Sequence, residues 1–388
     1  MRFQRIQAGA LAAMLLFTGA GVANAQTPDA ADAVIGTGTA ASCQTNQASN
    51  DFTNAVIAGG VVSFNCGPNF VEIDVNTSVV DKTVTVNGGG LIGLNGEDVR
   101  QIFLVIGTGN LTVNDISLLD GGGGGGNGGA ISIATNGQVT INRSFLTSNL
   151  TESGSDGGAI YTSGILTIND STLGANEAKT AGGDGGAIYI NGGTVVIRDS
   201  YLINNQAQNG GAVRLIGGTL TFERTTMRSN IARANGGGLH IESNNGSIIN
   251  STFSNNKADR GGGIYNQSGQ TTLKNTILAG SLDEAGSSPS LNCDGPTMTS
   301  GGRNIVGDNS CVPNPGSSGD LFSTDPQIGV YFGAPTRGYI PAATSPAVDY
   351  GIGCPAVDQR NYPRPLGAAC DVGAIERGSL TYLPLIKR

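Results

Sequence analysis

A four-residue motif recurs six times between residues 127 and 280, and its regular spacing constrains the fold more than any other feature. Each copy has two glycines, a small residue and an aliphatic residue, and the copies start 29, 28, 25, 26 and 25 residues apart. The copies begin at Gly128, Gly157, Gly185, Gly210, Gly236 and Gly261. A period in the mid-twenties is typical of stacked repeats, which bury their apolar sides only against neighbouring repeats.

A second motif follows each of the first five copies and places an apolar residue three positions before an asparagine. The pairs are Leu146/Asn149, Leu173/Asn176, Leu202/Asn205, Met227/Asn230 and Phe253/Asn256, and a sixth copy near Leu278 lacks the asparagine. Because an amide side chain both donates and accepts, stacked asparagines would bond from coil to coil. We expect the paired glycines to supply positive φ or close backbone approach where the chain bends.

Between these motifs, apolar and polar residues alternate with a period of two, as they do in strands. Val139/Ile141 and Leu166/Ile168 are examples, with Asn142 and Asn169 on the polar side. Flexible glycine-rich sequence would lack this alternation. The pattern predicts an all-β fold, a single-stranded parallel β-helix in which each repeat is one coil.

The chain divides into five predicted segments. Residues 1–25 read as a signal peptide, with Arg2 and Arg5 before an apolar run and cleavage after Ala25. A flexible lead-in (26–42) precedes the β-helix with its N-terminal cap (43–280). Proline-rich turns then predict an irregular C-terminal cap (281–378). The tail (379–388) reads equally well as a sorting tag and as a frayed strand.

Charge and cysteine content limit the possible partners and the cellular location of the protein. The formal net charge is −8, which argues against nucleic acid or an anionic membrane as partner. No segment after the signal peptide is long and apolar enough to span a bilayer. Six cysteines permit fifteen connectivities, and because the central repeats contain none, we expect three local disulfides. These are Cys43–Cys66, Cys293–Cys311 and Cys354–Cys370. We therefore expect a secreted or cell-surface protein, and a monomer.

The repeat motifs resemble those of polymorphic outer-membrane proteins. The mature chain is similar to bacterial secreted β-helix proteins with choice-of-anchor Q domains, especially over residues 345–376, where Ser345-Pro346-Ala347-Val348-Asp349 and Cys370-Asp371-Val372-Gly373-Ala374 stand. The resemblance implies a right-handed helix of the pectin-lyase-like fold with disulfide-linked caps. It implies no catalytic residues.

Carboxylate pairs are the first place to look for chemistry, because residues one coil apart become neighbours. Asp156 and Asp184 precede two glycine pairs and would stack about 5 Å apart, close enough for a weak Ca²⁺ site. We prefer the interpretation that both are solvated, and we expect no other cofactor. Asp170 and Asp199 stack likewise, and we interpret them as part of an ion-paired strand edge flanked by arginines.

The residue after each glycine motif should face outward and form a stripe along the helix axis. The candidate ligand-binding residues are Tyr161, Tyr189, Arg214, His240 and Tyr265, preceded by Ser132. Aromatic rings stack on sugars, and arginine binds hydroxyls or carboxylates. The alternative is that the tyrosines only stabilise the sheet. We expect His240, which has no paired acid or nucleophile, to be a surface residue.

Two functions remain open. The first is an adhesin-like or glycan-binding scaffold without a catalytic site, whose partner is an extracellular glycan or a surface protein. The alternative is a pectate-lyase-like polysaccharide lyase or a glycoside hydrolase acting on acidic polysaccharide. We favour the scaffold and lean against an enzyme, because no constellation of acid, base and nucleophile stands out from the repeat.

Overall fold

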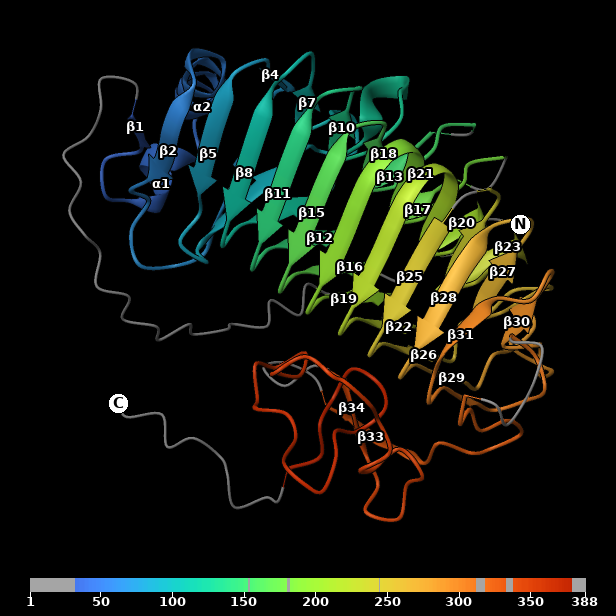
Figure 1. Cartoon of the computed structure of the whole chain (residues 1–388). Helices are drawn as coiled ribbons and strands as arrows, with labels where there is room; N and C mark the ends of the chain where they lie inside the picture. The colour runs from blue at the N-terminus through green and yellow to red at the C-terminus, as the bar shows by residue number, and fades with distance from the viewer. Residues whose placement is uncertain are drawn as a thin grey trace.

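The computed structural model describes residues 32–378, apart from residues 153, 180–181, 244, 312–317 and 333–337. Over these residues the chain forms a β-solenoid of about ten turns with little helix, which confirms the predicted fold class (Figure 1). The predicted signal peptide with its cleavage after Ala25, the start of the lead-in and the tail (379–388) lie outside the described residues.

Each coil contributes to the same sheets, and the strands of successive coils pair in parallel. The 18-stranded sheet contains two series of strands. The first series is β4 (Ser78–Val80), β7 (Phe103–Val105), β10 (Ile131–Ile133), β14 (Ile160–Thr162), β18 (Ile188–Arg198), β21 (Val213–Glu223), β24 (Leu239–Ile241), β27 (Ile264–Asn266) and β30 (Cys293–Asp294). The second series shares β18 and β21 and adds β1 (Ala33–Ile35), β2 (Gly60–Phe64), β5 (Thr83–Asn87), β8 (Asn110–Asn114), β11 (Gln138–Asn142), β15 (Ile165–Asn169), β25 (Asn245–Ile249), β28 (Gln270–Lys274) and β31 (Thr299–Gly302).

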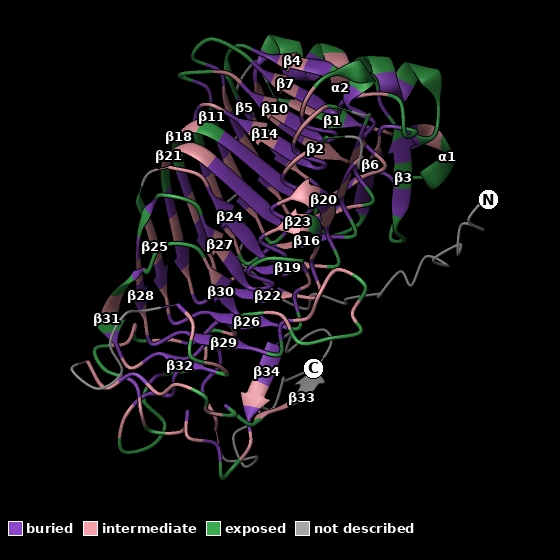
Figure 2. Cartoon of the chain, turned by 90° about the vertical axis from the view of Figure 1, so that its right-hand side faces the viewer, coloured by how far each residue is buried: buried purple, intermediate pink, exposed green. Residues whose placement is uncertain are grey.

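Two further sheets complete the coils. The ten-stranded sheet is β3 (Val71–Asp74), β6 (Ile92–Asn95), β9 (Ser117–Leu119), β12 (Phe145–Thr147), β16 (Thr172–Gly174), β19 (Tyr201–Ile203), β22 (Thr226–Arg228), β26 (Thr252–Ser254), β29 (Ile277–Ala279) and β32 (Ile305–Val306). The four-stranded sheet is β13 (Leu150–Thr151), β17 (Glu177–Ala178), β20 (Gln206–Asn209) and β23 (Ile231–Asn235), and a 3₁₀ turn, η1 (Gly123–Gly125), precedes it. The aliphatic residues of all coils form one continuous core (Figure 2).

The glycine pairs supply both the positive φ and the close backbone approach that were expected of them. In the pair Gly157-Gly158, the first glycine has a φ of +69°, and a Cβ on the second would lie 2.2 Å from the carbonyl oxygen of Gly186. The other corners use non-glycine residues in the left-handed region, such as Arg143 at +47° before β12 and Ser148 at +58° after it. Sequence reasoning missed these corners, because arginine and serine give no signal for positive φ.

The predicted asparagine column also forms. Asn176 donates from Nδ2 to Asn205 Oδ1 at 2.9 Å and to the Leu146 carbonyl at 3.0 Å. Its own Oδ1 accepts from the backbone and side chain of Asn149. The column therefore satisfies backbone groups at a buried corner, which no solvent reaches.

A helix that the sequence interpretation did not predict closes the N-terminal end. α2 (Asn46–Ala58) begins after Thr45, whose side chain accepts from the Ala48 N–H at 3.0 Å. Its buried side carries Phe52, which packs against Phe64 and Phe103 with ring centroids 5.9 and 6.1 Å apart. The helix thus covers the apolar core that the first coil would otherwise expose.

The lead-in is more regular than expected. Its residues include β1, which pairs in parallel with β2, and most of α1 (Ala40–Cys43), which begins after the capping residue Thr39. The disulfide Cys43–Cys66 joins α1 to the loop after β2. The backbone groups of β1 form their hydrogen bonds with β2. This strand was not predicted, because the sequence of the segment has no period-two pattern.

The solenoid continues past the predicted boundary at residue 280. β30, β31 and β32 pair in parallel with β27, β28 and β29 and add one more coil, although the repeat motifs are lost. The predicted Cys293–Cys311 disulfide forms next to β30. The last coil therefore pairs strand by strand with the coil before it, although its sequence lacks the repeat motifs.

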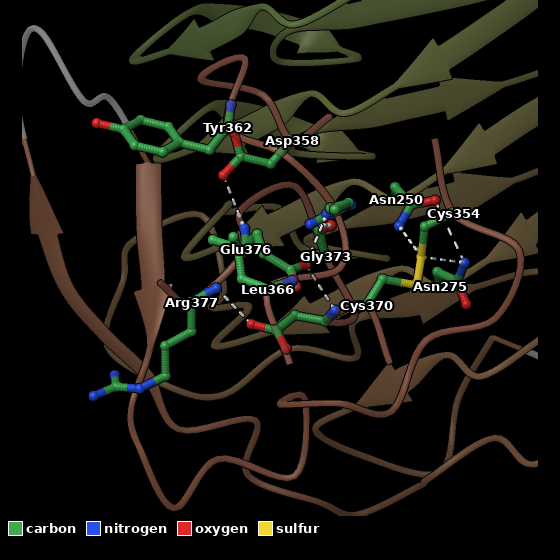
Figure 3. Close-up of polar contacts among 12 residues, drawn as sticks. Asn250, Asn275, Cys354, Asp358, Tyr362, Leu366, Cys370, Gly373, Glu376 and Arg377 are labelled. Carbon is green, nitrogen blue, oxygen red and sulfur yellow. Dashed lines mark hydrogen bonds and ion pairs between the residues drawn. A yellow bond between two sulfur atoms is a disulfide. The ribbon is translucent and has the colours of Figure 1, made fainter. Parts of the chain in front are cut away.

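The remaining C-terminal segment lies along the outside of the ten-stranded sheet. It includes the antiparallel pair β33 (Ile328–Phe332) and β34 (Gly338–Pro341). Gln359 donates to the Ser200 carbonyl at 2.9 Å and accepts from the Thr226 hydroxyl at 2.6 Å. The Gly373 N–H donates to the Asn275 carbonyl at 2.8 Å. The Cys354–Cys370 disulfide, the third predicted bond, lies against Asn250 and Asn275 (Figure 3).

A buried polar network holds this segment together. Arg364 pairs with Glu376 at 3.0 Å, and both side chains are almost fully buried. Glu376 also accepts from the backbone of Leu366 and Asp371, and its own N–H donates to Asp358 (Figure 3). These residues belong to the stretch that carries the choice-of-anchor Q resemblance, so the motif there organises a docked segment.

Candidate ligand-binding site

The predicted stripe forms in register along the first series of strands. Ser132 pairs with Tyr161, and Tyr161 with Tyr189. The column continues through Arg214, His240 and Tyr265 to Asp294. The residues on either side in each strand point into the core, so all members of the column lie on the outward face. The C-terminal segment contacts the ten-stranded sheet, which lies on another side of the solenoid (Figure 1).

The two central tyrosines stack on each other. Their ring centroids are 5.5 Å apart and their planes differ by 11°. Tyr189 is only 8% exposed and lies near the Asp156 carboxylate. Burial, followed by the nearby carboxylates Asp156 and Asp184, raises its pKa. Tyr161 is more open, and its hydroxyl accepts from Asn191 Nδ2 at 2.9 Å. Of the pair, Tyr161 is the one that a ligand can reach.

Arg214 and His240 are buried, at 7% and 2% exposure. The expectation that His240 lies on the surface is therefore wrong. Arg214 donates to the His240 ring, with Nη1 2.7 Å from Nε2, and pairs with Glu242 on the next coil. Its Nε lies 3.7 Å from Asp184 on the preceding coil. Burial and then the Arg214 charge lower the pKa of His240 to about 3, so the ring is neutral.

Asp156 and Asp184 stack one coil apart, as expected, but they serve the backbone. Asp156 Oδ1 accepts from the Asp184 N–H at 3.0 Å. Asp184 Oδ1 accepts from the N–H and the side chain of Asn209 at 3.0 and 2.9 Å. Burial raises the pKa of both carboxyl groups. Among the described residues, no group of three or more His, Cys, Asp or Glu side chains could hold a metal ion.

The second carboxylate ladder is ion-paired. Arg224 contacts Asp199 through Nε and Nη2 at 2.6 and 2.8 Å, and Arg143 contacts Asp115 in the same way. Arg143, Asp199 and Arg224 sit at corners with positive φ. Two-point pairing of this kind is directional and strong, and for Asp199 it agrees with the predicted ion-paired strand edge.

The side chains at the C-terminal end of the stripe also contact one another and their neighbours. Arg260 lies over the Tyr265 ring at 4.8 Å and pairs with Asp294 at 2.8 Å. The rings of His240 and Tyr265 are perpendicular, with centroids 4.7 Å apart. Tyr265 therefore has neighbours on both sides along the axis, whereas Tyr161 has an aromatic neighbour on one side only.

Comparison with known proteins gives one short match. A family model described as Chlamydia polymorphic membrane protein (Chlamydia_PMP) repeat matches residues 250–267. No curated protein and no solved structure matches the chain. The matched residues include Phe253 and Asn256, which are buried in the core and in the asparagine column, and the glycines from Gly261. The match therefore rests on residues that build a coil.

The match and the solenoid together indicate a surface-associated β-helix protein, and the disulfides fit an extracellular location. The likeness to choice-of-anchor Q domain proteins and to the pectin-lyase-like fold stays a prediction. Within the described residues, no helix is long and apolar enough to cross a membrane.

Proposed function

We propose that this chain is a surface-associated β-helix scaffold that binds an extended glycan along the outward face of its 18-stranded sheet. The solenoid provides a long face on which equivalent residues of successive coils lie about 4.8 Å apart. A glycan is a chain of repeating units, and such a face can meet several units with similar contacts. The proposal assigns the protein to binding and adhesion, without catalysis.

The observation that carries the proposal is the position of Tyr161. One face of its ring is covered by Tyr189, and the residue next to its other face in the register is Ser132. Serine is small, so this second ring face has space for a sugar. Aromatic rings with one polar end suit such amphipathic contacts.

The buried cluster beside Tyr161 favours binding over catalysis. Asp156, Asp184, Tyr189 and His240 all have shifted pKa values, which is a feature of active sites. However, Asp184 and His240 both contact Arg214, and His240 and Arg214 are almost fully buried. A neutral, buried histidine whose ring accepts from arginine is poorly placed to take a proton from a substrate.

The test is glycan retention by Tyr161→Ala, with Tyr161→Phe and Tyr265→Ala as matched variants. Loss of one stacking contact of about 1 kcal/mol should weaken retention roughly fivefold in Kd. Tyr161→Phe keeps the ring and should retain the ligand. Tyr265→Ala should have little effect, because Arg260 and His240 already flank that ring. Equal retention by Tyr161→Ala and the wild-type chain would contradict the proposal.

A further inference from the structure

Four consecutive coils repeat an apolar-Thr-apolar-Asn sequence next to the Tyr161 region. The copies are Val84-Thr85-Val86-Asn87, Leu111-Thr112-Val113-Asn114, Val139-Thr140-Ile141-Asn142 and Leu166-Thr167-Ile168-Asn169. They form β5, β8, β11 and β15, which pair in exact register. The apolar residues are buried in the core, and the threonines and asparagines face outward.

This part of the face carries no charge. The outward residue that precedes each motif is Thr83, Asn110, Gln138 or Ile165, so three neutral columns cross four coils. At the corner beside the asparagines, Asp115 and Arg143 pair with each other, and Asp170 follows Asn169 on the fourth coil. On the following coils the asparagine column changes to Arg198 and then Glu223, which also pair. The neutral area therefore has a defined end.

The asparagine column is held by its own hydrogen bonds. Asn114 Nδ2 donates to Asn87 Oδ1 at 2.8 Å, and Asn142 and Asn169 continue the chain with bonds of 2.9 Å. Each inner amide thus uses one hydrogen and one lone pair along the axis. One hydrogen and one lone pair remain for another partner.

The side chains of the threonine column are also largely ordered before a ligand binds. Threonine is β-branched, so its side chain has few rotamers to lose. In the described part of the chain, the hydroxyl groups of Thr85, Thr112, Thr140 and Thr167 have no hydrogen-bond partner. Binding to this surface would order few side chains, and that ordering is a main cost of association.

We infer that the Thr/Asn face of β5, β8, β11 and β15 is a binding site for an uncharged, extended, β-linked glycan that runs along the solenoid axis. Figure 1 shows these four strands side by side, with the C-terminal segment on another side of the solenoid. Hydroxyl and amide groups repeat about every 4.8 Å along each column, which suits a polymer with a hydroxyl-bearing unit at each step. A polyuronate would find no cation among these columns to balance its charge.

The inference rests on the proposed function and names its ligand class. Tyr161 lies on β14, in the same coil as Thr167 on β15. One glycan could therefore contact the open ring face and the polar columns together.

The experiment measures retention of cello-oligosaccharides, chito-oligosaccharides and polygalacturonate by the full chain and by three variants, one of which is Tyr161→Ala. The double variant Thr140→Val and Thr167→Val keeps shape and β-branching and removes two hydroxyls. It should weaken retention of the neutral oligosaccharides about tenfold, as expected for two lost hydrogen bonds. The matched control is Thr221→Val, in the same column but beyond the neutral area, and it should bind as the wild type does. High salt should leave binding unchanged, because no ion pair forms.

Three results would overturn the inference. Stronger retention of polygalacturonate than of the neutral glycans would show that the ligand is acidic. Unchanged retention by the double variant together with a loss in Tyr161→Ala would reject this face and leave the proposed function standing. A lack of retention of every glycan by the folded wild-type chain would reject both.

Discussion

At the scale of single residues, the buried asparagine column is the feature on which the coils most depend. Asn205 accepts from the backbone and side chain of Asn176 and donates to Asn230 and to the Leu173 carbonyl. All of these groups are shielded from water. A buried polar group that loses its partner costs about 1–3 kcal/mol, so the column is sensitive to any gap.

Asn205→Ala should therefore lower the free energy of unfolding by at least about 2 kcal/mol, because several groups lose their partners at once. The measurement is the midpoint of urea unfolding, followed by circular dichroism. Asn245→Ala, at an exposed position of β25, is the matched control and should stay close to the wild type. Equal midpoints for the two variants would show that the column contributes little.

His240 gives the second prediction, which concerns pH. Its pKa is about 3 in the folded chain and 6.5 as a free side chain. Because the folded value is the lower one, the unfolded chain binds the proton first, and stability is lost as pH falls through this window. The loss is at most about 1.4 kcal/mol for each pH unit.

His240→Gln keeps an acceptor for Arg214 and does not titrate, so its stability should fall less on acidification than that of the wild type. Unfolding midpoints at neutral and at acidic pH measure the difference. Asp156 and Asp184, whose pKa values are raised, act in the opposite direction but are present in both proteins. Parallel pH profiles would contradict the assignment of a buried neutral histidine.

The sequence predicted residues whose role repeats in every coil, since stacking turns equal positions into columns. The glycine pairs, the asparagine column and the register of the stripe are of this kind. The burial of Arg214 and His240 could not be predicted in this way. It depends on Asp184 from the coil before and on Glu242 from the coil after, which are different residues in each repeat.

At the scale of elements, the C-terminal segment is held to the solenoid by a small number of specific contacts. Gln359 reaches two strand ends through its amide, and Gly373 and Ile352 contact Asn275. Within the segment, the Arg364–Glu376 network and the Cys354–Cys370 disulfide maintain its shape. Gln359 therefore docks the segment without belonging to the ion pair or the disulfide that maintain its shape.

Gln359→Ala should loosen docking while the solenoid stays folded. It leaves the Ser200 carbonyl and the Thr226 hydroxyl without their partner. We expect faster hydrogen exchange over residues 345–377 and over β19 and β22, with unchanged exchange in β5 and β8. Exchange that rises evenly over all coils would indicate that the segment is needed for the solenoid itself.

The two ends of the solenoid were harder to predict from sequence than its central coils. α2 has apolar residues Phe52, Ala55 and Val56 at helical spacing, within a region that the sequence predicts only as an N-terminal cap. The last coil lacks the glycine motif before its first strand and the asparagine motif, and only pairing with β27–β29 identifies it. Caps differ from the repeat by necessity, since each covers a coil on one side only.

At the scale of the whole molecule, the solenoid presents one outward face that changes in character along its length. Its N-terminal coils carry neutral threonine and asparagine columns, with Tyr161 at their end. Its C-terminal coils carry ion pairs such as Arg198–Glu223 and Arg260–Asp294. In the proposed function the sugar chain lies on the accessible, neutral part, whereas the charged side chains of the other part pair with one another.

The measurement that tests this account most directly is a glycan-array screen of the purified protein, with Ca²⁺ and without, while ultraviolet absorbance reports unsaturated sugar products. The account predicts retention of extended neutral glycans, independent of Ca²⁺ and without product. Release of product would contradict the binding-scaffold function and direct attention to Asp156 and Asp184. A folded chain that retains no glycan would contradict it equally.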